Sequence, residues 1–160
     1  MSIEPREFRD TVGCFATGIT IITTVEADGV PVGLTANSFT SLSLDPPMVL
    51  FCLDFKVASF GAFREGGHFA VNILSTGQQD LSSRFARSGP EKWEGVSFDT
   101  WETGSPILPG CLANMECKVF SINEAGDHVI VIGEVLRLER AQEDVGPLLY
   151  YRGGYASLTN

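Results

Sequence analysis

The sequence has no long hydrophobic run and few basic residues. None of its apolar stretches approaches the roughly 18–20 residues of a bilayer-spanning helix, and residues 1–7 lack the apolar centre of a signal peptide. Eleven Lys and Arg stand against twenty Asp and Glu, for a net charge of −9. Such a charge repels nucleic-acid phosphates and anionic lipid head groups. We therefore expect a cytoplasmic protein that binds neither nucleic acid nor membrane.

Cysteine and histidine are scarce and poorly spaced for metal binding. The four cysteines contain no C-x-x-C, and the only two histidines, His68 and His128, lie sixty positions apart. This pattern argues against a structural zinc site. Cys52 and Cys117 stand in alternating apolar stretches, so we expect reduced thiols that pack as small core residues. Disulfide bridging is the less favoured alternative.

Several catalytic motifs are also missing. The chain has no G-x-x-x-x-G-K-[ST], G-x-G-x-x-G, G-x-S-x-G or H-E-x-x-H, which argues against the nucleotide-binding, hydrolase and metalloprotease chemistries that these motifs carry. No two acidic residues are singled out for carboxylate-pair hydrolysis. We interpret Glu134, Glu139 and Glu143 as ordinary solvated charges at strand edges.

The length and composition predict one domain over residues 1–160. With 44% apolar and 19% charged residues the chain has ample material for a single core. Alternating or β-branched segments predict strands over residues 18–25, 30–35, 48–53, 68–74, 114–122 and 128–138. The turn sequences Asp28-Gly29 and 124–127 predict two hairpins.

Helical spacing predicts three helices among these strands. One opens the chain after Pro5 and ends near Gly18, a second follows Lys56, and a third follows a capping box at residues 75–78. About six hairpin-connected strands with these helices favour a mainly β fold, a closed or nearly closed antiparallel barrel. Residues 87–111 form a long excursion rich in Gly and Pro, and we expect it to cover something because compact domains seldom carry so long an idle loop.

The segment 33–47 is unusual because small and hydroxyl-bearing residues replace bulky apolar ones. Its backbone could be approached closely by a flat polar ligand. A Ser/Thr-rich edge strand and turn is the alternative, and composition alone favours it. By the same reasoning, Gly126-Asp127-His128 alone is only a turn followed by a histidine.

The order of several segments resembles the flavin reductase family, short flavin:NAD(P)H oxidoreductases with an FMN-binding split-barrel fold. The resemblance is nearly full length. It rests on residues 33–53, 69–74, 84–86, 126–128 with 132–135, and 147–155. It implies an antiparallel split β-barrel of Greek-key type with a leading helix and short inserted helices.

The resemblance also implies a set of flavin contacts. The expected cofactor-binding residues are Thr35, Ala36, Asn37, Ser38, Ser41, Leu42, Ser43, Cys52, Leu53, Lys56, Ser59, Arg84, Phe85, Ala86, Tyr151 and Tyr155. Residues 35–38 and 41–43 would line the isoalloxazine and ribityl chain, with Cys52 and Leu53 facing them. Lys56 and Ser59 would hold the phosphate, and residues 84–86 would contact phosphate or ring. Either tyrosine would close over the site.

His128 is the expected catalytic residue, near the nicotinamide or the reactive edge of the flavin. A structural role is its alternative, as it is for His68, and for Lys56 and Arg84 the alternative is a solvated charge. Because a net charge of −9 opposes anionic cofactors, basic residues such as Lys56, Arg84 and Arg152 must offset it locally.

The function implied is an NAD(P)H-dependent flavin reductase that uses FMN or FAD with NADH or NADPH. Its product, reduced flavin, would serve a partner monooxygenase. The family resemblance further implies a homodimer with its sites at the subunit interface. Two alternatives remain open: a non-catalytic flavin-binding or electron-carrier protein on the same barrel, and a small barrel that acts as an interaction module without a cofactor.

Overall fold

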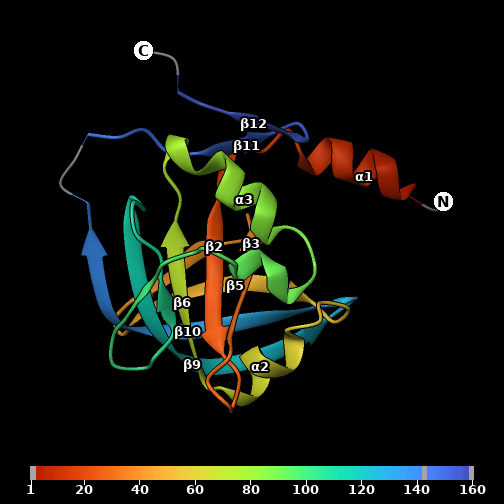
Figure 1. The fold of residues 1–160 in the computed structure, drawn as a ribbon. Helices are drawn as coiled ribbons and strands as arrows, with labels where there is room; N and C mark the ends of the chain where they lie inside the picture. The colour runs from red at the N-terminus through yellow and green to blue at the C-terminus, as the bar shows by residue number, and fades with distance from the viewer. Residues whose placement is uncertain (1–2, 142–143, 159–160) are drawn as a thin grey trace.

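The computed structural model describes residues 3–141 and 144–158 and is built around one antiparallel sheet. Its strands are β2 (Thr20–Val25), β3 (Pro31–Ala36), β4 (Thr40–Leu44), β5 (Pro47–Asp54), β6 (His68–Ile73), β9 (Ala113–Ala125) and β10 (His128–Arg140). They lie in the order β3-β2-β6-β9-β10-β5-β4 (Figure 1). The mainly β, antiparallel fold predicted from the sequence is confirmed.

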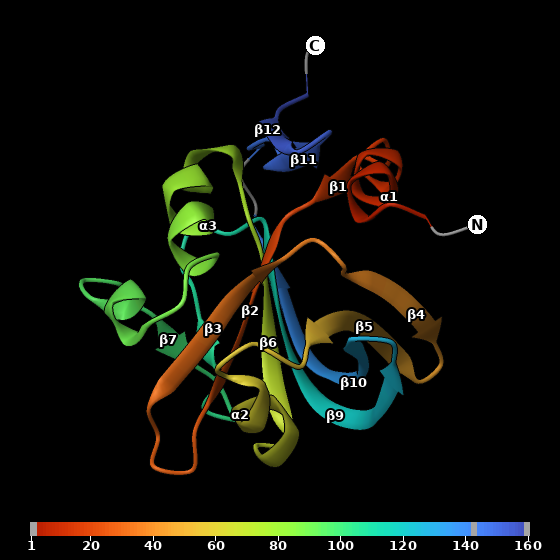
Figure 2. The ribbon, with the colours of Figure 1, turned by 90° about the vertical axis from the view of Figure 1, so that its right-hand side faces the viewer.

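The sheet is strongly curled, as Figure 2 shows. Its two edge strands, β3 and β4, are joined by only residues 37–39. In a flat sheet of seven strands they would lie roughly 29 Å apart, whereas the linking residues span at most about 15 Å. The edges therefore approach one another at this end. Within the described ranges no hydrogen-bonded pair joins β3 to β4, which is the arrangement of a split barrel.

The core consists of two clusters of buried apolar side chains. The first fills the curled sheet, where Phe51 packs edge-on against Phe63 and Phe69 with ring centroids 5.8 and 5.1 Å apart. Phe63 belongs to the short helix α2 (Phe60–Glu65), which therefore closes one end of the barrel. The second cluster includes Ile21, Leu74 and Phe85 and lies under the helix α3 (Gln79–Phe85).

The predicted helices form, with corrected ends. The leading helix α1 (Pro5–Val12) stops at Gly13 and does not continue toward Gly18, because residues 17–18 form strand β1 and pair with the tail. The second helix starts four residues beyond Lys56, after a turn in which the Lys56 N–H donates to Asp54 Oδ1 at 2.8 Å. The capping box predicted at residues 75–78 is confirmed, and it opens the 3-10 turn η1 (Thr76–Gln78) ahead of α3.

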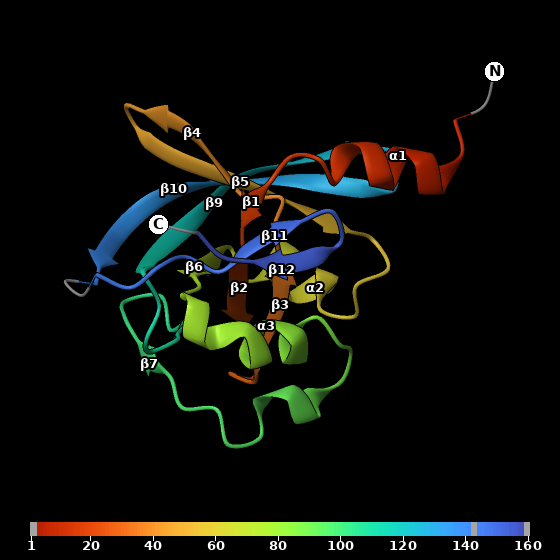
Figure 3. The same cartoon turned by 90° about the horizontal axis from the view of Figure 1, so that it is seen from above.

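A small second sheet, which was not predicted, joins the two ends of the chain. Strand β1 (Thr17–Gly18) pairs with β11 (Leu149–Tyr151), which pairs with β12 (Gly154–Ala156). The Arg152 N–H also donates to the Gly13 carbonyl at 2.8 Å. Figures 1 and 3 show this tail lying beside α1 and over α3.

The excursion over residues 87–111 is ordered by packing. It contains the 3-10 turn η2 (Pro90–Trp93), β7 (Asp99–Thr100) and β8 (Pro106–Ile107). Trp93 packs edge-on against Phe85, with centroids 4.8 Å apart. The Thr103 N–H and hydroxyl both donate to Oε1 of the fully buried Glu116 at 2.7 Å. These contacts fix the excursion to α3 and to the sheet.

All four cysteines are free thiols, as predicted. Burial, reinforced by the neighbouring Glu116, raises the pKa of Cys117 to about 12. Burial likewise raises the pKa of Cys111 to about 11. Among the described residues, every helix is too short or too polar to span a bilayer.

Candidate active site

A cleft of about 430 Å³ opens between β3, the segment that follows β5, and the end of α3. Its volume falls within the range of small-molecule sites, about 300–1,000 Å³. The lining residues are Glu26, residues 30–35, Asp54, residues 56–59, residues 85–90, Lys92 and Trp93. Five of the predicted flavin contacts lie among them: Thr35, Lys56, Ser59, Phe85 and Ala86.

The inner wall depends on a close contact between β3 and α3. The Thr35 hydroxyl donates to the Ser82 carbonyl at 2.7 Å and so ties the helix to the strand. A Cβ placed on Gly33 would lie 3.0 Å from the Phe85 ring and 3.1 Å from Trp93. A glycine at this position therefore lets both rings rest directly on β3 without being displaced.

The opposite side of the cleft is fixed by the pairing of β5 with β10. In this register Asp54 lies opposite His128, and the Phe55 N–H donates to the Asp127 carbonyl at 3.2 Å. The chain then turns through Lys56 to Ser59, the N-cap of α2. Residues from three distant parts of the sequence thus meet at one end of the barrel.

His128 begins β10 at the rim of this site, beside the cleft but not among its lining residues. Its Nδ1 lies 2.6 Å from Asp127 Oδ1, a contact that orients the partly exposed ring. The hydrogen bond from His128 is the main reason that the pKa of the Asp127 carboxyl lies below its usual value. Nearby Lys56 lowers it further. The Asp127 carboxylate thus gives the His128 ring a defined hydrogen-bond partner at the rim of the site.

The predicted contacts on residues 36–43 lie outside this cleft. Ala36 is buried in the core, whereas Asn37, Ser41 and Leu42 are exposed and Ser43 is half-buried. The Ser38 hydroxyl is used within the fold. It accepts from the Cys52 N–H at 3.0 Å and lies 3.2 Å from the Cys52 carbonyl, to which it donates.

Four further predicted contacts also lie outside the cleft, namely Cys52, Leu53, Tyr151 and Tyr155. The Leu53 side chain is 1% exposed and packs in the first core cluster, so any ligand contact there would be through its backbone. The Tyr155 hydroxyl lies 3.0 and 3.1 Å from the hydroxyls of Ser82 and Ser83, and so binds α3. Tyr151 is exposed, with the Arg152 guanidinium 5.2 Å from its ring centroid.

Arg84, another predicted flavin contact, lies outside the cleft. Its Nη2 donates to the carbonyl of Glu91 at 3.1 Å and to that of Glu94, and it lines a separate depression with Gly95 and Val96. The predicted motif 84–86 is thus divided, with Phe85 and Ala86 on the cleft and Arg84 on the other side of α3.

Sequence reasoning missed the part of the cleft formed by the excursion. Arg87, Ser88, Lys92 and Trp93 line it. Partial burial lowers the pKa of Lys92, and neighbouring Glu91 opposes this effect. Two features of the sequence pointed to this part of the cleft. Arg87 directly follows the motif 84–86, and the long excursion over residues 87–111 was expected to cover another part of the protein.

These residues fit a flavin nucleotide. Gly33 lets the aromatic rings of Phe85 and Trp93, which both line the cleft, lie against β3. Hydroxyl groups from Thr35 and Ser59 and cations from Lys56, Arg87 and Lys92 line the same cleft. Such a combination suits a ligand with a planar ring system, a polyhydroxyl chain and a phosphate.

Comparison with known proteins agrees with this geometry. The profile of the flavin reductase like domain matches residues 12–159. The chain belongs to the flavin reductase family. Among its relatives is the flavin-dependent monooxygenase reductase subunit HsaB of Rhodococcus jostii, 44% identical over 98% of this chain and 80% of that protein.

Two other relatives extend the comparison. The FMN reductase (NADH) SmoA of Agrobacterium fabrum is 41% identical over 94% of this chain and 84% of its own. The crystal structure of nitrilotriacetate monooxygenase component B from Mycobacterium thermoresistibile superimposes with a TM-score of 0.92 at 44% identity, covering 96% of this chain and 86% of that one. The family resemblance inferred from the sequence is therefore confirmed.

Proposed function

We propose that this chain is the NADH-dependent flavin reductase of a two-component monooxygenase system and supplies reduced flavin to its oxygenase partner. The observation that carries the proposal is the cleft on which Thr35, Lys56, Ser59, Phe85 and Ala86 converge beside His128. The relatives support it, because one is named a monooxygenase reductase subunit and another an FMN reductase (NADH).

The bound flavin would accept a hydride from the dihydronicotinamide, so the two cofactors carry the redox chemistry. The residues of this chain bind and orient. Phe85 and Ala86 would contact the ring, Thr35 and Ser59 the polar groups, and Lys56 the phosphate. His128, held by Asp127, would orient the nicotinamide. Orientation of two reactants is itself a large source of rate enhancement.

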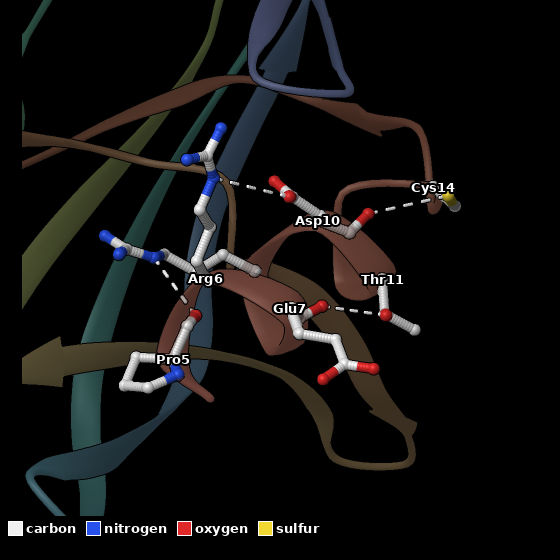
Figure 4. A network of polar contacts seen from close by, with 7 residues as sticks. Pro5, Arg6, Glu7, Asp10, Thr11 and Cys14 are labelled. Carbon is white, nitrogen blue, oxygen red and sulfur yellow. Dashed lines mark hydrogen bonds and ion pairs between the residues drawn. The ribbon is translucent and has the colours of Figure 1, made fainter. Parts of the chain in front are cut away.

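We further propose that the enzyme is a homodimer whose second copy covers α1 and β4. Helix α1 buries none of its residues, and Phe8, Val12 and Phe15 are exposed. Figure 4 shows that the polar side chains of α1 bond mainly to one another and to the helix backbone. Phe8 and Val12 on this helix, and Phe15 just beyond it, are uncovered in the single chain.

Strand β4 supports the same interface. It is an edge strand of the main sheet, and Leu44 is 95% exposed. Figure 2 shows α1 and β4 on the same side of the molecule. A second copy docked there would cover Ser41, Leu42 and Ser43, which are predicted flavin contacts outside the cleft of the single chain.

We also propose that the protein is cytoplasmic, because the reducing cytoplasm would keep its four free thiols reduced.

The absorbance spectrum of the purified protein with added FMN or FAD, before and after anaerobic NADH, tests the proposed activity. Bleaching of the flavin band on NADH addition, together with steady-state NADH oxidation that depends on free flavin, is expected. Tight flavin retention with slow NADH turnover would instead identify a non-catalytic carrier. A colourless protein whose melting temperature does not rise with flavin would contradict flavin binding altogether.

A further inference from the structure

We propose that Arg87 and Lys92 form a phosphate subsite on the wall of the cleft built from residues 87–93, and that Arg84 positions this wall without touching the ligand. This inference rests on the flavin reductase function proposed above. The phosphate would belong to the flavin nucleotide or to the nicotinamide dinucleotide, and the experiment below separates the two sources.

Lys92 is a half-buried cation that forms no ion pair within the part of the chain that the structure describes. It lines the cleft, and its Nζ donates to the Arg87 carbonyl at 3.2 Å and lies 5.9 Å from the Phe85 ring centroid. Partial burial of an ammonium group is costly unless an opposite charge or strong acceptors compensate. Desolvation accordingly lowers the pKa of Lys92, and an anion in the cleft would reverse that effect.

The charges of the cleft contrast with those of the whole chain. Three cations, Lys56, Arg87 and Lys92, face it together with two carboxylates, Glu26 and Asp54. Even with both carboxylates charged, the lining carries one more positive than negative charge. In a chain of net charge −9 this local excess of cations favours an anionic group. Phosphate is the anion that Lys and Arg recognise by charge-assisted hydrogen bonds.

Arg84 acts on this subsite from outside the cleft. Both hydrogen bonds of its Nη2 go to backbone carbonyls, those of Glu91 and Glu94, which flank Lys92 and Trp93 in the sequence. Arg84 lines the neighbouring depression and not the cleft itself. Removal of its guanidinium would take this donor from the Glu94 carbonyl and leave the Glu91 carbonyl with the Glu94 N–H alone, and so would loosen the segment that carries Lys92. The effect of Arg84 on a ligand should therefore depend on Lys92.

A double-mutant cycle tests this dependence. The affinities for FMN and for riboflavin, which lacks the phosphate, are measured by flavin fluorescence quenching for wild type, Lys92→Met, Arg84→Met and the double variant. The FMN-to-riboflavin affinity ratio should fall roughly ten- to a hundred-fold in Lys92→Met, the size of a lost charge-assisted hydrogen bond. Arg84→Met should also lower this affinity ratio. The double variant should lower it no further than Lys92→Met does alone. Lys118→Met removes one exposed positive charge on β9 and is the control.

Other outcomes have definite meanings. Additive falls in the double variant would make Arg84 a direct phosphate ligand and overturn its positioning role. Equal weakening of both flavins by Arg84→Met, with an unchanged ratio, would reduce Arg84 to a structural residue and also overturn it. If Arg84→Met does not fold, Arg84→Gln, which keeps an NH₂ donor without the charge, takes its place. A wild type that binds neither flavin would refute the proposed function itself, independently of the subsite.

The source of the phosphate is resolved with two hydride donors. The KM for NADH is compared with that for 1-benzyl-1,4-dihydronicotinamide, which has no phosphate. If Lys92→Met raises only the KM for NADH and leaves the flavin ratio unchanged, the subsite holds the nicotinamide dinucleotide. If it changes neither ratio, there is no phosphate subsite on this wall.

Discussion

Asn37 stands at the point where the chain crosses from one edge of the sheet to the other. Its side chain is exposed and makes none of the described side-chain hydrogen bonds, so its removal should not harm the fold. As a ligand residue it would lose a hydrogen bond worth about 1–3 kcal/mol. Asn37→Ala should therefore weaken flavin binding roughly five- to a hundred-fold, as measured by fluorescence quenching. Asn123→Ala, an exposed asparagine on β9, should leave it unchanged. Equal affinities for both variants would contradict a ligand role for Asn37.

His128 has a natural control in the only other histidine. Both begin strands, but His68 turns its Nδ1 to the Gly66 carbonyl at 3.0 Å, whereas His128 is held by Asp127 beside the cleft. His128→Ala should lower kcat/KM for NADH by about ten- to a hundred-fold, which is about 1.4–2.7 kcal/mol. Flavin affinity should change little.

Steady-state kinetics and a flavin titration on the same variants decide the role of His128. The variant His68→Ala should retain wild-type kcat/KM. If His128→Ala abolishes flavin binding without a separate effect on NADH, the histidine belongs to the flavin pocket. If neither quantity changes, His128 is a structural residue at the rim.

The contact between β3 and α3 is the element-scale feature on which the cleft depends. In Gly33→Ala the new methyl group would meet the rings of Phe85 and Trp93 at 3.0–3.1 Å, so these rings must shift. Such overpacking typically costs about 1–3 kcal/mol. We expect a lower free energy of unfolding in urea together with weaker flavin binding. Gly18→Ala, with nothing within 4 Å of the new methyl group, is the matched control for both measurements. A Gly33→Ala variant as stable as that control would show that the wall can adapt.

The elements with a strong local pattern could be predicted from the sequence, and the others could not. Strand β10 and the capping box before α3 each have a periodic or paired signal of their own. Strand β1 has two residues and exists only because β11 lies beside it, a contact that no local pattern encodes. The position of Arg84 is of the same kind, because its carbonyl partners lie on a loop seven and ten residues away.

The residues of the candidate site divide in the same way, into those that the sequence pattern reveals and those that only tertiary contacts bring to the cleft. The family resemblance identified residues on β3, after β5 and on α3, and the fold brings five of them together on one cleft. Lys92 was missed because its surroundings, the Phe85 ring and the Arg87 carbonyl, are brought to it only when the excursion packs on α3. Such surroundings depend on tertiary contacts and leave no periodicity in the sequence.

At the scale of the whole molecule, the uncovered apolar surface predicts association. Sedimentation at micromolar concentration should give about twice the chain mass of 17.3 kDa, because large exposed apolar patches mark interaction surfaces. Leu44→Asp should shift the protein toward monomer and lower the rate of NADH oxidation. Val145→Asp, an exposed apolar position outside α1 and β4, should do neither. A monomer with full turnover would contradict an active site completed by the second copy.

The pairing of β5 with β10 also sets the order in which the site is completed during synthesis. Asp54 and its cross-strand neighbour His128 are separated by 74 positions, so the ribosome must add all of them before the two can meet. At about 5–20 residues per second this takes roughly 4–15 s. Throughout that interval the nascent chain carries Lys56 without the strand that will hold it at the cleft. A chain of this topology therefore cannot complete the rim of the cleft until about four-fifths of its residues have been added.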